Sequence, residues 1–429
     1  MELTPEQVEE LDEGRRRALF YRTAGIEEIR DTVRDIVDRV RADGDAALRD
    51  FSRDFDDVEL DAIDVTDRVD GARNRIDPDV LEAIETASEN VRSFHERQLR
   101  SDWREESGGR SVGRRFRPLD RVGVYAPGGT AAYPSSVLMG VIPATVAGVD
   151  EVAVATPPAE ELNPVTLAAI DVADADEVYS LGGAQAVAAL AYGTETVDPV
   201  QKVVGPGNRW VTAAKAAVQG TVAIDFLAGP SEILVVADET ADPSFVAADL
   251  LAQAEHDPNS SVVAVTDDSE TAEAICTAVE SAIAERERSS VIEESLSQDA
   301  SGVFVAHSMA EATSFAESYA SEHLSIQTAD DEAVLDRIDS AGSVFLGPYT
   351  PVAAGDYATG TNHVLPTSAK AKVVGGLSVD TFTRASTVQR LSEEGLSDLE
   401  ATITTLARAE GLEAHAASVE ERLRGEPSR

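Results

Sequence analysis

The sequence predicts an α/β protein built on parallel sheets, with helical segments at both ends. From Arg121 onward, short runs rich in β-branched residues alternate with alanine-rich helical runs, an alternation that is typical of βα units. The first hundred residues and the tail from about Leu377 have helical patterns instead. The chain has 429 residues, 43% of them hydrophobic, which suffices for two or three domains with cores of their own.

The N-terminal region is expected to be helical. Thr4 to Gln7 has the pattern of a capping box, with Pro5 at the first helical position. A further amphipathic helix stops at Gly44, and its apolar face carries Ile26, Ile29, Val33, Ile36 and Val40. Asp77 and Pro78 open another helix.

Two βα arrays follow. In the first we expect strands at Val122–Ala126, Glu151–Thr156, Glu177–Leu181 and Gln201–Val204, with helices at Gly183–Tyr192 and Arg209–Gln219. In the second we expect strands at Ile233–Ala237, Ser261–Thr266, Val303–Ala306 and Val344–Leu346, with helices at about 243–255, 269–287 and 309–320. Gly347–Thr367 is expected to be a long loop, and such loops are often functional. Because ligands of open α/β folds sit at the carboxyl ends of strands, we expect functional residues just after strands.

The chain is strongly acidic. Its 79 Asp and Glu residues against 36 Lys and Arg residues give a net charge of −43, which repels nucleic acid and anionic membranes. A nucleic-acid mimic would also be acidic, but here the acidity is spread through the whole chain, which favours a salt-adapted protein. The basic residues are nearly all arginine, and lysine occurs only at positions 202, 215, 370 and 372.

Three features indicate a cytoplasmic protein. The single cysteine, Cys276, excludes an internal disulfide. The acidic start, Met1–Glu6, lacks the apolar core of a signal peptide. The most apolar run, Val137–Val149, is too short to span a bilayer and contains Pro143.

Two short segments carry paired polar side chains. Gln253 and His256 lie three residues apart in the last turn of an expected helix, so they share a face that suits a metal site. Gln is an uncommon zinc ligand, however, and an ordinary polar helix end has the same pattern. Glu322 and His323 offer two proton acceptors of different pKa, whereas the alternative is a histidine that interacts with a helix dipole.

The long loop and the tail hold further candidates. Asp356 can bind a metal, and His363 can be a ligand, a proton donor or a residue that holds the loop together. Glu410 and His415 converge on one ligand only if Gly411 breaks the helix between them. The other histidines, His95 and His307, are expected to be structural.

The nucleotide signal is weak from the residues alone. Gly205-Pro206-Gly207-Asn208 follows a strand and opens a helix, where a diphosphate would bind. The dinucleotide fingerprint is incomplete because Trp210 occupies the third glycine position. Asp225 nevertheless has the spacing of a ribose ligand, about 20 residues on.

Ten short strings, in order across residues 20–420, together resemble the histidinol dehydrogenase family. They are YAPGG (125–129), YPSS (133–136), GGAQA (182–186), VGPGN (204–208), AGPSE (228–232), AQAEH (252–256), SEHL (321–324), GDY (355–357), TNHVLPT (361–367) and AEGL (409–412). The resemblance implies two incomplete Rossmann-like parallel-sheet domains with helical N-terminal and C-terminal segments. It also implies a homodimer that oxidises L-histidinol to L-histidine through L-histidinaldehyde, the last step of histidine biosynthesis, with NAD⁺ and zinc.

The resemblance also implies residue roles and domain boundaries. One Zn²⁺ per subunit would be bound by Gln253, His256, Asp356 and His415 of the partner subunit. The substrate would contact these ligands together with Ser231, His323 and Glu410, the last also from across the dimer interface. NAD⁺ would contact Tyr125, Gln185 and Asn208, and His363 matches a recurrent active-site histidine. The implied division is 1–20 as a helical arm, 21–120 plus 233–376 as the main domain with the zinc site, 121–232 as the NAD-binding domain, and 377–429 as a helical dimerisation tail.

These roles lead to an expected mechanism. His323 is the expected base for the hydroxyl proton, and Glu322 is expected to activate the water that hydrates the aldehyde. Zinc would polarise the oxygen and position the substrate. Cys276 lies in an ordinary amphipathic helix, which favours a core residue and a hydrated aldehyde over a thiohemiacetal. The alternatives are a paralogue that oxidises another polar alcohol and a non-catalytic acidic binding protein.

Overall fold

The computed structural model describes residues 3–128 and 132–424. Met1 and Glu2 of the acidic start, Gly129 of the 125–129 string and the last five residues of the tail lie outside this range. The chain divides into two compact units: unit 1 is Met1–Gln98 with Leu119–Phe382, and unit 2 is Leu99–Pro118 with Thr383–Arg429. Unit 1 contains two parallel sheets and unit 2 a small antiparallel one, so the predicted α/β class is confirmed.

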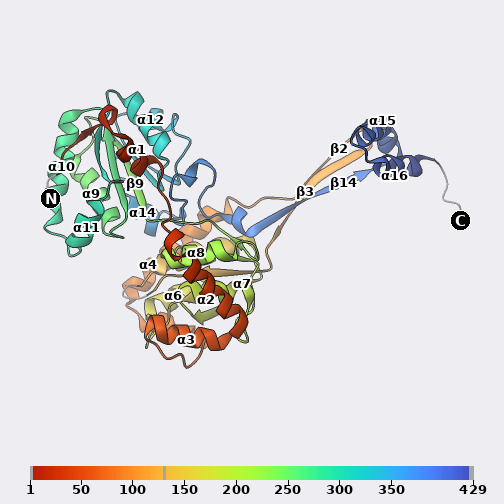
Figure 1. Cartoon of the computed structure of the whole chain (residues 1–429), viewed down its shortest axis with the longest axis horizontal. Coiled ribbons are helices and arrows are strands. Elements are labelled where there is room, and N and C mark those ends of the chain that lie inside the picture. The colour runs from red at the N-terminus through yellow and green to blue at the C-terminus, as the bar shows by residue number, and fades with distance from the viewer. Residues whose placement is uncertain (1–2, 129–131, 425–429) are drawn as a thin grey trace. The chain divides into compact units, whose positions relative to one another are not determined.

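A six-stranded parallel sheet has the order β1-β11-β10-β9-β12-β13. Its strands are β1 (Glu6–Gln7), β9 (Glu232–Ala237), β10 (Ser261–Thr266), β11 (Gly302–Val305), β12 (His323–Gln327) and β13 (Ser343–Leu346). Its helices are α1 (Glu13–Phe20), α9 (Pro243–Ala254), α10 (Ser269–Ile283), α11 (Ser289–Leu296), α12 (Met309–Tyr319), α13 (Asp331–Leu335) and α14 (Val352–Tyr357). Helices α9, α10 and α11 form the core on one face of the sheet, and α1 and α12 form it on the other (Figure 1). Coverage on both faces explains why β9 and β10 are buried along their whole length.

A five-stranded parallel sheet has the order β6-β5-β4-β7-β8. Its strands are β4 (Arg121–Tyr125), β5 (Glu151–Thr156), β6 (Glu177–Ser180), β7 (Lys202–Val204) and β8 (Ala223–Ile224). One face packs against α2 (Arg30–Asp43), α3 (Asp45–Asp56), α7 (Gly183–Tyr192) and α8 (Arg209–Val218). The other face packs against α4 (Pro78–Glu96), α5 (Pro134–Ala147) and α6 (Pro164–Ala173). Short 3-10 helices lie at Val8–Glu10, Glu27–Ile29, Thr66–Val69, Ala72–Arg75, Lys370–Lys372 and Val379–Phe382.

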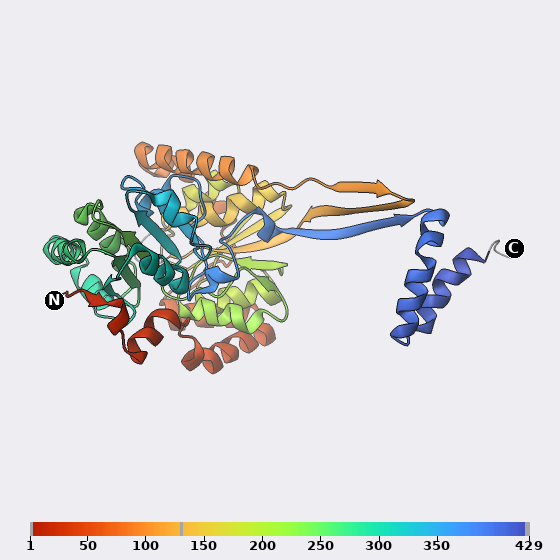
Figure 2. The same cartoon turned by 90° about the horizontal axis from the view of Figure 1, so that it is seen from above.

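Unit 2 is an antiparallel sheet followed by a helix pair. The sheet has the order β14-β3-β2, with β2 (Trp103–Ser107), β3 (Arg110–Pro118) and β14 (Thr383–Leu391). After β14 the chain enters α15 (Glu393–Ala409) and α16 (Glu413–Leu423), which pack against each other (Figure 2).

Two sequence predictions of local structure, a helix start near the N-terminus and a long loop, are wrong, and a third needs an addition. The expected helix start at Thr4–Gln7 is instead the strand β1, which pairs with β11. The tail from Leu377 is mainly helical as predicted, through α15 and α16, but it also contains β14, which pairs with β3 along nine residues. The expected loop Gly347–Thr367 contains the helix α14.

The domain boundaries stay a prediction, but the packing of the N-terminal helices differs from the expected grouping. Residues 21–120 were expected to join 233–376, whereas α2, α3 and α4 contribute to the two cores of the five-stranded sheet. No helix within the described ranges is long and apolar enough to cross a membrane.

Candidate active site

Glu322 and His323 lie at the amino end of β12, which lies between β9 and the edge strand β13 of the six-stranded sheet. Helix α12 ends at Tyr319, Ala320 takes a left-handed conformation (φ 51°), and β12 begins at His323. His323 lies beside Ile233 of β9 and Ser343 of β13. The expectation that functional residues follow strands is therefore wrong for this pair, because the chain enters the sheet at these residues.

The main chain of one residue, Glu232, contacts both side chains. The main-chain N–H of Glu232 donates to Oε2 of Glu322 over 2.8 Å, and its carbonyl oxygen is 3.0 Å from Nδ1 of His323. Because a carbonyl only accepts hydrogen bonds, Nδ1 must carry the proton. Nε2 of His323 is buried without a hydrogen-bond partner, and it lies 3.7 Å from Oδ1 of Asp356. The unprotonated nitrogen of a neutral His323 is therefore available to a ligand.

Burial and nearby charges shift the pKa values of this pair. Burial raises the pKa of Glu322 to about 7. Burial by itself lowers the pKa of His323. The carboxylates of Glu322 (3.6 Å from Nδ1) and Asp356 together have the larger effect, so the pKa of His323 is raised overall. A carboxyl group that titrates near neutrality can both take up and release a proton, as an acid–base catalyst must.

Asp356 is surrounded by imidazoles. It lies on α14, and its main-chain oxygen is 3.1 Å from Nδ1 of His363, whose Nε2 is 3.5 Å from Oγ of Ser136. Burial acts to raise the pKa of Asp356, but His323, His363 and His256 lower it below its usual value. Burial of part of the residue lowers the pKa of His256, and Asp356 acts in the opposite direction; the residue as a whole is exposed. The structure thus gathers residues from four sequence-distant segments at one place.

The residues at this place fit a zinc ion in part. Gln253, in the last turn of α9, is 2% exposed and its Nε2 has no hydrogen-bond partner, which is costly for a buried amide. Rotation of the amide by 180° puts its oxygen at that unpartnered position, where it can bind a cation. With His256 and Asp356 this chain then offers one nitrogen and two oxygen donors. Within residues 3–128 and 132–424, no group of three or more His, Cys, Asp or Glu side chains is arranged to hold a metal.

The predicted NAD⁺ contacts lie at the carboxyl ends of strands, whereas Glu322 and His323 lie at an amino end. Tyr125 ends β4, Gln185 is in the first turn of α7 after β6, and Asn208 caps α8 after β7. These are the carboxyl ends of the five-stranded sheet, as expected. Oδ1 of Asn208 already accepts from the main-chain N–H groups of Trp210 and Val211, so its amide nitrogen is the group that faces outward.

Asp225 has a structural role. Its carboxylate accepts from Gly205 N (2.9 Å) and pairs with Lys215 Nζ (2.7 Å), so it holds the loop before α8 rather than a ribose. Sequence reasoning missed Asp56, whose Oδ2 is 3.5 Å from Nε2 of Gln185. Burial raises the pKa of Asp56 to about 6. No local motif distinguishes it from the other acidic residues near it.

Ser231 and the tail residues are placed separately. Ser231 immediately precedes β9 and is half-buried beside the Glu232 peptide. Glu410 and His415 lie in unit 2 and are exposed. Helix α15 ends at Ala409, Gly411 has φ 76°, and α16 starts at Glu413, so the helix break that these two residues require is present.

The remaining candidates have structural surroundings. Buried His95 contacts the main-chain oxygen of Val91 at 2.7 Å, and exposed His307 pairs with Glu9 at 2.7 Å. Cys276 is buried in α10, and burial raises the pKa of its thiol to about 11.

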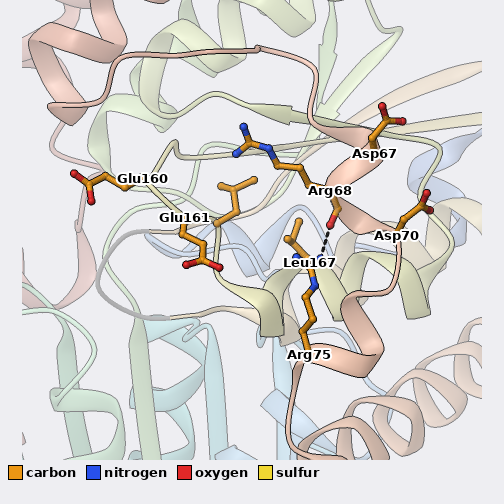
Figure 3. Close-up of a pocket in the computed structure, with 8 residues that line it drawn as sticks. Asp67, Arg68, Asp70, Arg75, Glu160, Glu161 and Leu167 are labelled. Atoms are coloured by element: carbon orange, nitrogen blue, oxygen red, sulfur yellow. Dashed lines mark hydrogen bonds between the residues drawn. The ribbon is translucent and has the colours of Figure 1, made fainter.

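A separate pocket of about 200 Å³ holds none of the predicted residues (Figure 3). Its lining is largely acidic and consists of Asp67, Arg68, Asp70, Arg75, Glu160, Glu161, Leu162 and Leu167. None of the residues that line this pocket has a buried polar side-chain atom without a hydrogen-bond partner, so the pocket gives no indication of a ligand.

Comparison with known proteins agrees with this arrangement. The model of the family "Histidinol dehydrogenase" matches residues 21–423. The chain is 67% identical over 422 residues to histidinol dehydrogenase of Halobacterium salinarum, covering 98% of this chain and 99% of that relative. It is 46% identical over 428 residues to the enzyme of Methanosarcina barkeri, covering 99% and 98%. It is similar, with a TM-score of 0.93 and 36% identity, to the crystal structure of histidinol dehydrogenase from Elizabethkingia anophelis, covering 99% and 98%. The chain belongs to the histidinol dehydrogenase family.

Proposed function

We propose that the chain oxidises L-histidinol to L-histidine through L-histidinaldehyde, with two NAD⁺ consumed in succession. Family membership over nearly the whole chain supports the substrate and the cofactor. The observation that carries the proposal is the buried Glu322–His323 pair, both members of which contact the main chain of Glu232, with Nε2 of His323 left without a partner. A binding protein without catalysis would have no need of this costly arrangement.

In the first oxidation, Nε2 of His323 accepts the hydroxyl proton while the carbinol hydride leaves to NAD⁺. The products are the aldehyde, NADH and one proton. The orientation of His323 supports this role, because its other nitrogen is held as a donor by the Glu232 carbonyl. The two neighbouring carboxylates stabilise the imidazolium that forms.

In the second oxidation, Glu322 takes a proton from the water that adds to the aldehyde. The hydrate forms as the monoanion, because Glu322 keeps the water proton; it loses hydride to a second NAD⁺, and the carboxylic acid that results gives its proton to His323, which leaves the carboxylate. A pKa of Glu322 near 7 supports this role, since such a group is partly ionised at neutral pH and still basic. Buried Cys276 lies in a helix of the core and is not suited to a covalent thiohemiacetal.

Gln253, His256 and Asp356 would hold Zn²⁺ together with His415 of the partner subunit. When bound, zinc supplies Lewis-acid polarisation of the substrate oxygen and a template for its amine and imidazole. Ser231, His323 and Glu410 would contact the substrate, while Tyr125, Gln185 and Asn208 would contact NAD⁺.

We place Glu410 and His415 in the active site of a second copy, so the enzyme would be a homodimer with shared sites. Both residues are exposed on unit 2. Exposed apolar side chains are typical of a surface that binds another protein. Unit 2 exposes the large apolar side chains of Trp103, Val112, Leu391, Leu406 and Leu412.

The central test is NADH formation from L-histidinol in molar KCl, with and without a chelator. We expect activity that the chelator abolishes and zinc restores. Glu322→Gln should slow histidinaldehyde oxidation more than histidinol oxidation. Full activity of this variant in both steps would contradict the role of Glu322 in water activation. An inactive His415→Ala protein mixed with an inactive His323→Ala protein should regain activity on subunit exchange, because each mixed dimer has one intact site.

A further inference from the structure

Glu232, whose main chain contacts Glu322 and His323, is itself held by a buried ion pair through its side chain. Arg22 reaches the Glu232 carboxylate with both branches of its guanidinium: Nε to Oε1 over 2.7 Å and Nη2 to Oε2 over 2.8 Å. The two side chains are only 7% and 2% exposed. A bidentate pair of this kind fixes orientation as well as distance.

Arg22 also contacts the segment that leads into Glu322. Its Nη2 donates to the main-chain oxygen of Tyr319 over 2.9 Å, and its guanidinium stacks over the Tyr319 ring at 3.7 Å. Tyr319 is anchored in turn, since its hydroxyl is 2.6 Å from Oγ of Ser261. Tyr319 lies three residues before Glu322, so one guanidinium links the start of β9 to the end of α12.

The Glu232 carboxylate has one more partner, on a third segment. Its Oε1 accepts from the main-chain N–H of Ser368 over 2.7 Å. The carboxylate is therefore fully occupied by neighbours within the protein and does not face a ligand. Neither Arg22 nor Glu232 offers a free polar group for chemistry.

We propose that Arg22 and Glu232 are positioning residues that set the orientation of the acid–base pair. This inference rests on the proposed roles of Glu322 and His323. Arg22 clamps the Glu232 side chain; the main-chain N–H of the same residue then determines where the Glu322 carboxylate lies, and its carbonyl determines which nitrogen of His323 carries the proton. A purely structural need is a weak explanation, because a buried ion pair stabilises little more than apolar residues of the same size.

The consequence for catalysis is specific. If the main chain at Glu232 shifts, the Glu322 carboxylate and the His323 imidazole both lose the hydrogen-bond partner that positions them, whereas Gln253, His256 and Asp356 do not depend on it. Small misplacements of catalytic groups lower rates by up to about 100-fold. We therefore expect kcat to fall about 10- to 100-fold for both oxidations, with zinc content and the KM for L-histidinol little changed.

The test uses the full-length enzyme and the double variant Arg22→Met/Glu232→Met. Removing both charges avoids an uncompensated buried ion, so the fold should persist. Arg22→Lys keeps the positive charge but cannot form the bidentate pair, so it examines the same point if the double variant does not fold. The matched control is Arg121→Met/Glu177→Met, which removes another partly buried ion pair, at the amino edge of the five-stranded sheet.

The measurements are kcat and KM for L-histidinol and for L-histidinaldehyde, zinc content and melting temperature. The clamp variants should lose kcat in both oxidations at normal zinc content, and the control should keep its kcat even where it melts earlier. In the Glu322→Gln background, the clamp variant should lower aldehyde oxidation less than it does in the wild type, because both changes act through one group.

Each other outcome has a defined meaning. Wild-type kcat in folded clamp variants overturns the inference, as does an equal loss of kcat in the control. Fully multiplicative effects with Glu322→Gln would mean that the clamp does not act through that carboxylate, which also overturns it. If Glu322→Gln and His323→Ala themselves leave both oxidations intact, the proposed function has failed instead.

Discussion

The substitution Asp249→Asn should stabilise the protein at neutral pH and not at acid pH. Asp249 is buried on α9, where Oδ2 accepts from Nε2 of Gln327 over 3.2 Å. Burial raises its pKa from 3.8 to about 6, against a smaller lowering effect of the main chain at Val352. Since one pKa unit corresponds to about 1.4 kcal/mol, the ionised carboxylate costs up to about 3 kcal/mol in the folded state.

The sign follows from proton binding. Between about pH 4 and pH 6 the folded protein holds this proton more tightly than the unfolded chain, so the stabilising contribution of the neutral form is lost as pH rises through 6. Asn has no proton to lose and keeps an oxygen for Gln327. The variant should therefore match the wild type near pH 4 and exceed it by up to about 3 kcal/mol above pH 7.

Urea unfolding of zinc-free protein in molar KCl, repeated across this pH range, measures the difference from midpoint and slope. Asp336→Asn, at an exposed position, measures the effect of removing one charge from an acidic surface. After that effect is subtracted, a difference that is flat with pH, or one that grows toward acid pH, would refute the reasoning.

Three further outcomes are expected. Gly205→Ala should lower the free energy of unfolding by at least about 2 kcal/mol, because its φ is +110° and the new Cβ would lie 2.2 Å from the main-chain oxygen of Tyr125. The control Gly220→Ala, whose new Cβ would have nothing within 4 Å, should melt close to the wild type. Equal melting temperatures of the two variants would contradict the close approach at Gly205. Cys276→Ala should still form two NADH per histidinol, whereas loss of the second NADH alone would indicate a covalent thiol step. The melting temperature should fall as KCl is lowered from about 3 M to 0.2 M, because the net charge of −43 is then less screened, and a constant melting temperature would speak against salt adaptation.

Local patterns in the sequence were sufficient for most of the βα framework. The strands β5 and β10 and the helix α7 have the bounds that the sequence predicts, because their signals are short-range periodicity and turn residues. The family strings were likewise sufficient for membership, which the family model and the 67% identical relative confirm.

Structural features that depend on contacts between residues distant in sequence could not be recognised from the sequence. The strand β12 is fully buried, yet its Ser325 and Gln327 are polar; Gln327 is tolerated because it pairs with Asp249 on α9. The sequence also did not explain the four lysines. Each donates to a main-chain carbonyl, and those acceptors are in Thr381, Gly205, Leu227 and Ser318.

The candidate site shows the same division between sequence and fold. The sequence by itself singled out Glu322, His323 and Asp356 as side chains able to move protons or hold a metal, since that follows from their chemistry. Only the tertiary structure placed the pair at the amino end of β12 and joined both side chains to the main chain of Glu232. Main-chain N–H and C=O groups are the same at nearly every position of a sequence, so a site built on the backbone of one residue and a distant arginine is recognised only when β9, β12 and the N-terminal segment come together.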